Sequence, residues 1–278
     1  MNKREKQIHI GRINYTNVWP IFHSFPQGEL RDSVQFIEQV PSSLNRAMKA
    51  GEVDMGPISS FAYGENFKNY VLYPDLSVSA RDRVNSILLF HRKPLEEIKN
   101  GRIALTNASA TSVNLLKIIL QKFYGGTPTY TTSPPVLEEM MVDHDAALLI
   151  GDEAIRSSWV DSGYTVTDLG QEWRKWTGKG MTFAVWAIRE DTIEKYPQMV
   201  EQLFQAFVHS KQESLAHPLA MVHDAMALVG GTEAYWLHYF GNLCYDFGPE
   251  QWDGLQLYYQ YAWELGFLPE QVEMKLWS

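Results

Sequence analysis

The segment RIALTNASATSVNLLKIILQKF, residues 102–123, carries the structural unit that defines the fold. Residues 102–105 predict a short strand, and the apolar stripe of residues 111–123 predicts a helix. A short polar stretch, residues 107–112, separates the two. A strand that leads through a polar junction into a helix is the repeating unit of a parallel sheet covered by helices.

The same unit recurs on both sides of this segment. We predict strands at residues 8–13, 34–40, 53–56, 76–79, 86–91, 102–105, 127–131, 146–150 and 181–188. We predict helices between them at residues 18–25, 41–50, 61–67, 111–123, 135–142 and 153–159. The remainder is helical in pattern, at residues 191–196, 198–214, 218–229, 233–240 and 249–265. The sequence therefore predicts an α/β protein with parallel-rich sheets, flanking helices and a C-terminal helical region.

The alternation restarts near residue 102, which predicts two α/β lobes. Residues 86–91 lead into the second lobe and residues 181–188 lead back. We place residues 1–90 and 188–278 in lobe 1 and residues 91–187 in lobe 2. Two crossing segments form a hinge, and ligands bind in the cleft between such lobes.

Composition restricts the class of ligand. The chain of 278 residues has 24 Lys and Arg against 33 Asp and Glu, a net charge of −9 that disfavours nucleic acid. Its one cysteine, Cys244, allows no internal disulfide, and no His or Cys spacing predicts a metal site. The apolar runs are too short for a membrane span, and no signal core follows the charged start, so we expect a cytoplasmic protein.

Small polar residues gather at four strand-to-helix junctions, residues 15–17, 58–60, 107–112 and 151–153. The carboxyl ends of parallel strands are where ligands of such sheets bind. Each helix start also offers unpaired backbone N–H groups and a dipole that favours an anion. These junctions predict a site for a small carboxylated molecule.

Helix capping is the alternative explanation for each junction, because Ser, Thr and Asn are preferred N-caps. Residues 107–112 are more polar than a single cap requires, so ligand contact and capping both stay open there. Asp152 and Glu153 are candidates for a catalytic carboxylate pair. The alternative is that they complement the helix dipole, as acidic residues in a first helical turn commonly do.

Further candidates have a structural interpretation that we favour. Cys244 lacks an obvious activating neighbour and is interpreted as a buried thiol, and Arg81 and Arg83 as solvated surface residues. The aromatic residues of the C-terminal region are interpreted as core or as a subunit interface rather than a stacking platform: Trp236, Tyr239, Phe240, Trp252, Tyr258, Tyr259 and Trp263.

Five stretches, taken in order, resemble the chorismate dehydratases of the futalosine route to menaquinone. They are GRINYTNVWP (11–20), GEVDMGPISS (51–60), VNSILL (84–89), ALTNASATSV (104–113) and DAALLIGDEA (145–154), followed by Trp173 and residues 177–186. The sister family that makes 1,4-dihydroxy-6-naphthoate opens differently from residues 14–17 of this chain.

The resemblance implies a two-lobed fold like that of the type II periplasmic binding proteins. It implies a hydro-lyase that converts chorismate to 3-[(1-carboxyvinyl)oxy]benzoate and water without a cofactor or metal. Asn17 and Ser86 match the active-site Asn and Ser of the family, in whose proposed scheme the substrate's enolpyruvyl carboxylate removes the ring proton. The substrate-binding residues expected from the junctions are Ser59, Ser60, Asn107, Ser109, Thr111, Ser112, Gly151 and Asp152.

The alternatives assign these residues structural roles: Asn17 caps a helix and Ser86 is a buried strand serine. Residues 177–186, TGKGMTFAVW, depart from the family pattern T-G-L-P-F-V-F-A-x-W, with Gly180 in place of Pro and an added charge at Lys179. This departure bears on lobe closure or substrate choice.

Two other functions compete with the one that the resemblance implies. One is a non-catalytic cytoplasmic binding protein for a small carboxylated ligand, and the other is a dehydratase for a different cyclic carboxylate. A solute receptor or a regulator is disfavoured, because the sequence shows no signal peptide, helix-turn-helix segment or basic surface. Besides the substrate, a second copy of the chain is the partner that we expect, as a homodimer.

Overall fold

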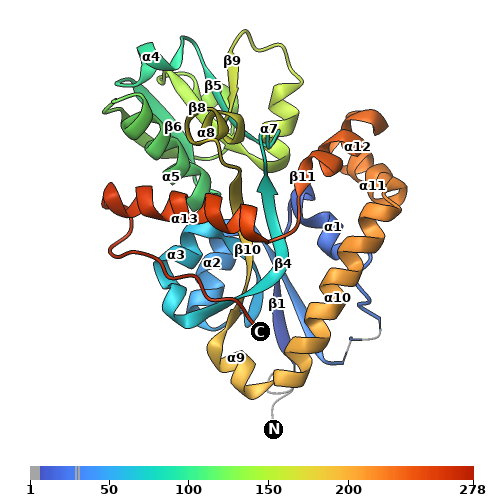
Figure 1. The fold of residues 1–278 in the computed structure, drawn as a ribbon. Coiled ribbons are helices and arrows are strands. Elements are labelled where there is room, and N and C mark those ends of the chain that lie inside the picture. Colours follow the sequence, from blue (N-terminus) through green and yellow to red (C-terminus); the bar gives the residue numbers. More distant parts are fainter. Residues whose placement is uncertain (1–6, 29, 31) are drawn as a thin grey trace.

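The strands form two separate sheets in the computed structural model, which describes residues 7–28, 30 and 32–278 (Figure 1). The first sheet has the order β11-β4-β10-β3-β1-β2, and the second has the order β7-β6-β8-β5-β9. The strands of the first sheet are β1 (Ile8–Ile13), β2 (Val34–Gln39), β3 (Met55–Ser59), β4 (Tyr70–Ala80), β10 (Met181–Arg189) and β11 (Leu243–Cys244). Those of the second are β5 (Ile87–His91), β6 (Arg102–Thr106), β7 (Thr129–Ser133), β8 (Ala146–Ile150) and β9 (Thr165–Asp168).

Each sheet combines parallel and antiparallel pairs. The parallel pairs are β1 with β2 and β3, and β6 with β7 and β8, as βαβ connections require. The antiparallel pairs all involve β4, β5 or β10, the strands next to the two places where the chain crosses between the sheets. By strand pairing, β5 belongs to the second sheet and β10 to the first; the division of the chain into lobes stays a prediction.

Helices cover the sheets, and all of them except α4 and α8 correspond to predicted helices. Those up to β10 are α1 (Trp19–Phe22), α2 (Pro41–Ala50), α3 (Ser60–Asn66), α4 (Leu95–Ile98), α5 (Ala110–Ile118), α6 (Leu137–Met140), α7 (Gly151–Ser158) and α8 (Leu169–Thr177). The predicted boundaries of α2 are confirmed: Pro41 occupies the first turn, and Gly51 ends the helix with φ 75°. Its buried side chains, Leu44, Ala47 and Met48 among them, pack against β1 and β3.

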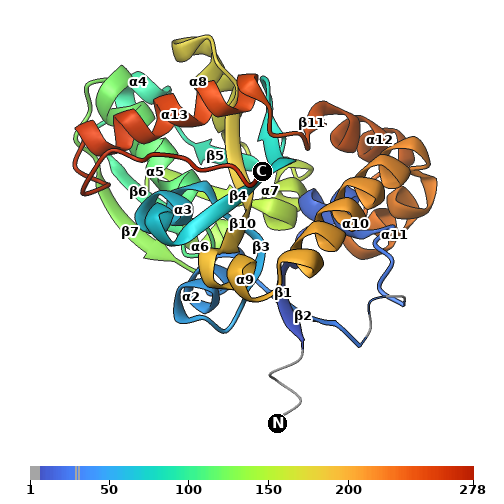
Figure 2. The same ribbon diagram turned by 60° about the horizontal axis from the view of Figure 1, so that its bottom comes forward.

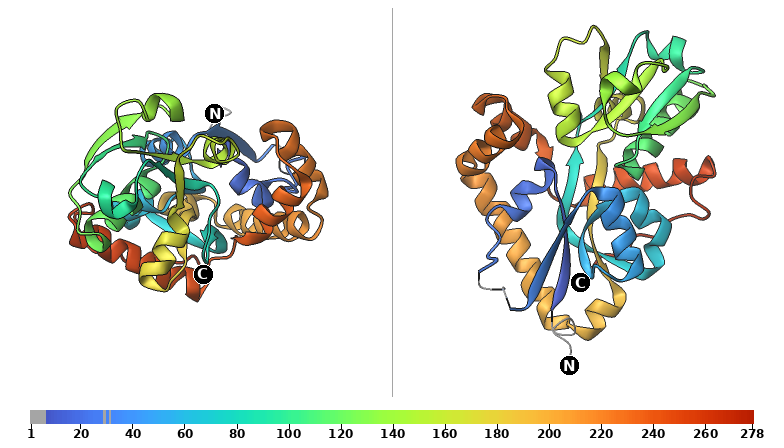
Figure 3. Two further views of the ribbon diagram at one scale, coloured as in Figure 1. Left: turned by 90° about the horizontal axis from the view of Figure 1, so that it is seen from above. Right: turned by 180° about the vertical axis from the view of Figure 1, so that it is seen from behind.

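The predicted C-terminal helical region is confirmed. It comprises α9 (Glu190–Lys195), α10 (Pro197–Ala216), α11 (Leu219–Val229), α12 (Glu233–Asn242) and α13 (Pro249–Glu264). Figures 1 and 2 show α10 along one side of the first sheet, with α11 and α12 at its far end. From behind, in Figure 3, the α11–α12 pair lies at the height where the two sheets meet.

The structure corrects several predicted boundaries. β3 runs to Ser59 rather than Gly56, and β4 begins at Tyr70 rather than Leu76. The sequence hides the start of β4 because Pro74 and Asp75 interrupt the alternation; Asp75 has φ 56°, and the pairing with β10 shifts register there. The helix predicted to end at Phe123 becomes a π-helix after Ile118. β9, β11, α4 and α8 were not predicted: β9 is a short, polar edge strand, and β11 and α4 have only two and four residues.

Most large apolar side chains are buried between these layers. Trp173, Trp186 and Trp236 are fully buried, and the aromatic residues Tyr258 and Tyr259 of α13 lie in the same core. Over the residues that the structure describes, no helix is both long and apolar enough to cross a membrane.

Candidate active site

Two strand-to-helix junctions of the first sheet are hydrogen-bonded to two strand-to-helix junctions of the second sheet. The 3₁₀ turn Thr16–Val18 after β1 bonds to the start of α7: Thr16 N and Oγ1 donate to Asp152 Oδ1 at 3.3 and 2.6 Å. The start of α3 bonds to the start of α5, since Phe61 N donates to Thr111 Oγ1 at 2.9 Å. The carboxyl ends of β1, β3, β6 and β8 are thereby brought together, as expected for a ligand site in an α/β fold.

Ser59 and Ser60 begin α3, and both are buried. Ser59 is the N-cap, as the capping alternative predicts: its Oγ accepts from Ala62 N at 3.2 Å and from Asn45 Nδ2 at 3.0 Å. Ser60 Oγ donates to Thr182 O at 2.8 Å, so its proton is already used. A hydroxyl accepts two bonds and donates one, so Ser59 keeps a proton to donate to a ligand, whereas Ser60 has a structural role.

The polar residues before α5 divide in the same way. Ser109 is the N-cap, accepting from Ser112 N at 3.1 Å and donating to Ser112 Oγ at 3.0 Å. Ser112 Oγ accepts from Ser109, and Thr111 Oγ1 accepts from Phe61 N. Both hydroxyl groups therefore keep a proton that can be donated to a ligand. Asn107 lies exposed on the loop before the helix. Helix capping explains the role of Ser109, but it does not use the hydroxyl protons of Thr111 and Ser112.

Gly151 and Asp152 begin α7 in an unusual conformation. Gly151 has φ 62°, and a Cβ there would lie 2.9 Å from the ring of Tyr15. Asp152 is buried, and desolvation raises the pKa of its carboxyl despite the opposing bonds from Thr16. Glu153 is exposed and pairs with Arg156 at 2.8 Å, so the two acidic residues face different surroundings and form no carboxylate pair.

Ser86 lies just before β5, beside the end of β8, because β5 and β8 are antiparallel with Ile87 opposite Ile150. Its carbonyl oxygen accepts from Gly151 N at 2.7 Å, and its Oγ accepts from Tyr239 OH at 2.9 Å. The buried carboxylate of Asp168 supports this segment by accepting from Val84 N and Asn85 N at 3.1 and 2.7 Å. Those bonds stabilise Asn85 at φ 60°.

Asn17 does not cap a helix. Neither the 3₁₀ turn nor α1 has a side-chain cap, and Asn17 Oδ1 is buried with no hydrogen-bond partner among the described residues. A buried acceptor without a partner costs free energy, so an unpaired Oδ1 is consistent with a ligand that completes it.

Several side chains around these residues were not assigned to the site from the sequence. Thr16 and Tyr15 belong to the first junction but were not among the expected substrate-binding residues. Tyr239 of α12 was interpreted as core or subunit interface, and Tyr235 of the same helix was not considered. Burial raises the pKa of Tyr15 to about 12, with Asp152 adding to the shift, and burial also raises the pKa of Tyr235. Tyr235 OH is buried without a partner in the described chain. No sequence signal separates these tyrosines from core aromatics.

The two positions that depart from the family pattern, Lys179 and Gly180, lie outside this cluster, although Thr182 of the same segment accepts from Ser60 Oγ. Lys179 Nζ pairs with Asp253 of α13 at 3.2 Å, and both side chains are solvent-exposed. Gly180 packs tightly: a Cβ there would lie 2.8 Å from Ala80 O. The added charge therefore binds α13 and does not reach the buried junctions.

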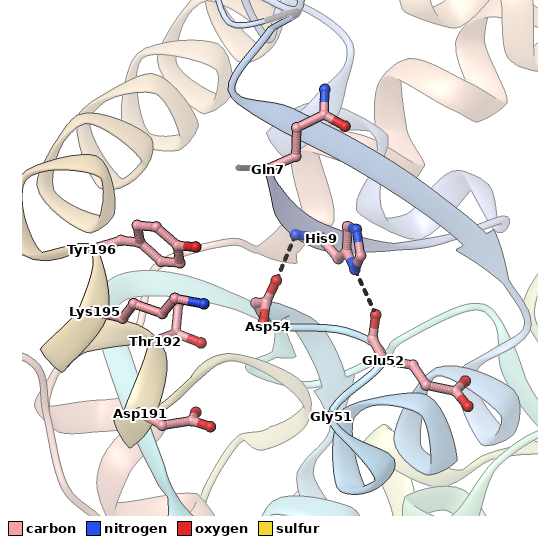
Figure 4. A pocket seen from close by; sticks show the side chains of 9 residues that line it. All are labelled: Gln7, His9, Gly51, Glu52, Asp54, Asp191, Thr192, Lys195 and Tyr196. Atoms are coloured by element: carbon pink, nitrogen blue, oxygen red, sulfur yellow. Dashed lines mark hydrogen bonds between the residues drawn. The ribbon is translucent and has the colours of Figure 1, made fainter. Parts of the chain in front are cut away.

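A separate cavity of about 350 Å³ lies at the opposite end of β1 (Figure 4). His9 N donates to Asp54 Oδ2 at 2.7 Å there, and His9 Nδ1 lies 3.1 Å from Glu52 O. Because this cavity adjoins the amino end of the parallel strands, we do not treat it as the active site. Within the described residues, no three His, Cys, Asp or Glu side chains are grouped so as to hold a metal ion.

Comparisons with known proteins identify the family. The model of a family described as "Menaquinone biosynthesis" matches residues 8–264. This chain belongs to the menaquinone biosynthesis family. A curated relative from Thermus thermophilus, named chorismate dehydratase, is 33% identical over 252 residues, which cover 85% of this chain and 88% of the relative.

Solved structures confirm the predicted fold for this member of the menaquinone biosynthesis family. A protein from Archaeoglobus fulgidus has a TM-score of 0.73 at 17% identity and covers 95% of this chain and 99% of its own. The periplasmic aliphatic sulphonate binding protein of Escherichia coli has a TM-score of 0.72 at 14% identity, with 98% and 92% covered. A Candida albicans protein described as having the generic periplasmic binding protein fold has a TM-score of 0.71 at 12% identity, with 98% and 97% covered. The two-lobed, periplasmic-binding-protein-like α/β fold is thus confirmed.

Proposed function

We propose that this member of the menaquinone biosynthesis family is a chorismate dehydratase, a hydro-lyase that converts chorismate to 3-[(1-carboxyvinyl)oxy]benzoate and water. The observation that carries the proposal is the 33% identity, over 85% of the chain, to a protein named chorismate dehydratase. The arrangement of the junctions supports the same assignment independently, because it gathers neutral hydrogen-bond donors at helix starts.

Chorismate is a dianion, and the site is suited to one without relying on cationic side chains. Ser59, Thr111 and Ser112 each keep a hydroxyl proton to donate, and each belongs to or adjoins the start of α3 or α5. Helix starts add unpaired N–H groups and a favourable dipole. Burial raises the pKa of the Asp152 carboxyl above its usual range, so its negative charge is disfavoured there more than at an exposed site.

The reaction requires little of the protein beyond orientation. The ring C–H bond breaks and its electron pair forms the new ring double bond, while the neighbouring C–O bond breaks and the hydroxyl leaves as water after taking a proton. In the proposed substrate-assisted scheme, the enolpyruvyl carboxylate accepts the ring proton and passes it to the departing hydroxyl, so the carboxylate is regenerated and one water leaves. The product is aromatic, so the elimination is strongly downhill, and correct orientation supplies much of the rate.

Asn17 and Ser86 are proposed to hold the reacting geometry. Ser86 Oγ, whose proton is held only by a long bond of 3.3 Å to Val84 O, would donate to the departing hydroxyl. Asn17 Oδ1 is a buried acceptor that a substrate hydroxyl would satisfy. The substrate would lie between the two lobes, against both crossing segments.

The test is to incubate the purified protein with chorismate and to follow the aromatic product by absorbance and mass. We expect turnover by the wild type and a loss of about a hundredfold or more in kcat for Asn17→Ala and Ser86→Ala. Ser210→Ala is the matched control, because Ser210 is a fully buried serine of α10 whose Oγ lacks a partner in the described structure.

Three outcomes would contradict the proposal. Binding of chorismate without product would instead indicate a carrier protein. Faster turnover of another cyclic hydroxycarboxylate in a substrate panel would overturn the choice of substrate. Near wild-type rates in both variants would remove Asn17 and Ser86 from the mechanism. The cytoplasmic location and the homodimer stay predictions.

A further inference from the structure

Tyr239 of α12 reaches the candidate active site from the C-terminal helical region. Its side chain is 1% exposed, and its OH donates to Ser86 Oγ at 2.9 Å across 153 residues of sequence. Tyr239 belongs to α12 and not to one of the strand-to-helix junctions. Its contact with Ser86 therefore depends on how α12 packs against the crossing segment before β5.

The hydrogen bond from Tyr239 determines what Ser86 can do with its own proton. Ser86 Oγ accepts from Tyr239, so its hydrogen must point to another acceptor. The acceptor in the structure is Val84 O at 3.3 Å, a long distance for an O–H···O bond, which is usually about 2.7–2.8 Å. Such a weak bond is readily exchanged for one to a bound substrate.

The position of Tyr239 is fixed by its neighbours. Its ring lies 5.4 Å from that of Trp236 and 5.5 Å from that of Phe240, measured between centroids. On the other side of Ser86, Asp168 accepts from Val84 N and Asn85 N and anchors the backbone. Ser86 is therefore supported from two directions, by a carboxylate through its backbone and by a phenol through its side chain.

Tyr239 stays a donor over the whole working range of pH. Burial raises the pKa of its phenol well above the ordinary value, and the bond to Ser86 and the nearby Asp152 act in opposite directions on that shift. The phenol therefore keeps the proton that it donates to Ser86 Oγ, and that bond orients the serine hydroxyl.

We propose that Tyr239 is a positioning residue that holds the Ser86 hydroxyl as a hydrogen-bond donor toward the substrate. This inference rests on the proposed dehydratase function and on Ser86 acting in it. It assigns α12, outside the two strand-and-helix halves of the chain, a direct part in preparing the site.

The test compares Tyr239→Phe with Tyr245→Phe. Both variants remove one buried phenolic hydroxyl, but Tyr245 OH has no hydrogen-bond partner among the residues that the structure describes. We expect Tyr239→Phe to lower kcat about ten- to a hundredfold with KM within about twofold, because the substrate still binds while the Ser86 proton is misdirected. Tyr245→Phe should leave both constants within about twofold. Since Phe keeps the ring contacts, the thermal unfolding midpoints of both variants should lie close to that of the wild type.

A double-mutant cycle separates positioning from a general structural role. In the Ser86→Ala background there is no hydroxyl to orient, so adding Tyr239→Phe should slow turnover no further. Full additivity of the two losses, or wild-type kcat in Tyr239→Phe, would overturn the inference while leaving the dehydratase proposal intact. Absence of any aromatic product from the wild-type protein would instead overturn the proposed function, and the inference with it.

Discussion

Asp152 is a buried carboxyl group placed where a dianion is proposed to bind. It accepts two bonds from Thr16, which favour the charged form, but desolvation outweighs them and raises its pKa. The carboxyl therefore links three properties of the molecule: the contact between the two sheets, stability, and the charge next to the substrate.

The pH dependence of stability should change in Asp152→Asn. Because the folded-state pKa lies above the ordinary 3.8, Asp152 contributes stability that is complete below pH 3.8 and is lost as pH rises through the folded pKa. Asn keeps an oxygen acceptor for Thr16 but has no charge to desolvate. We expect urea unfolding to show a smaller loss of stability between about pH 4 and about pH 7 than in the wild type. Asp143→Asn, at an exposed site, is the control, and an equal pH response in all three proteins would contradict the assignment.

Gly151 combines a left-handed backbone with close contact to Tyr15, and a second glycine separates the two effects. Gly163 has φ 70° with no atom near its missing Cβ, so Gly163→Ala should cost only the backbone strain, about 1–2 kcal/mol. Gly151→Ala adds a contact of 2.9 Å to the Tyr15 ring, so we expect a larger loss of stability together with a loss of turnover. Denaturant unfolding and chorismate assays check both. Equal stability losses for the two variants would show that Tyr15 moves away freely.

At the scale of elements, the starts of α3 and α5 stabilise each other. Thr111 Oγ1 accepts from Phe61 N, one of the N–H groups that α3 cannot satisfy internally. Thr111→Val keeps the shape and leaves that N–H buried and unpaired, so we expect a loss of about 1–3 kcal/mol in the free energy of unfolding. Thr131→Val, on the exposed side of β7, should stay within about 0.5 kcal/mol. A loss in Thr111→Val no greater than in Thr131→Val would argue against the cap.

Local sequence signals predicted the elements that have local causes. Proline in the first turn and glycine at the end define α2, and the capping serines Ser59 and Ser109 mark the starts of α3 and α5. β9 and α8 escaped prediction because the strand is polar and its stability comes from pairing with β5. Asp168 caps α8 and also accepts a hydrogen bond from the segment before β5. Nothing in the sequence indicates the second of these contacts.

At the scale of the whole molecule, the site contains residues that only the tertiary structure brings together. The junctions could be located from the sequence because each follows a strand. The aromatic pattern of α12 indicates that Trp236 and Tyr239 are buried, but not that Tyr239 faces Ser86. Periodicity identifies the buried face of a helix, and packing determines which residues that face contacts.

Trp159, at the end of α7, connects the two segments that supply Asp152 and Tyr239. Its ring lies 5.0 Å from that of Tyr235 and 6.4 Å from that of Trp236, although the residue is 39% exposed. Since such aromatic pairs contribute about 0.5–1.5 kcal/mol, Trp159→Ala should weaken the seating of α7 against α12. We expect KM for chorismate to rise about two- to tenfold, because α7 carries Gly151 and Asp152, and kcat to fall by a similar factor, because α12 carries Tyr239.

Trp176 offers the matched control for this prediction. It is 44% exposed and stacks on Phe123 at 5.3 Å, but it belongs to α8, whereas α7 carries Gly151 and Asp152. Trp176→Ala should lower the thermal unfolding midpoint to a similar extent and leave KM within about twofold of the wild type, because it removes a comparable aromatic contact elsewhere. Steady-state kinetics and thermal melts of both variants decide the matter. An equal rise in KM in the two variants would mean that general destabilisation, rather than the contact between α7 and α12, controls substrate binding.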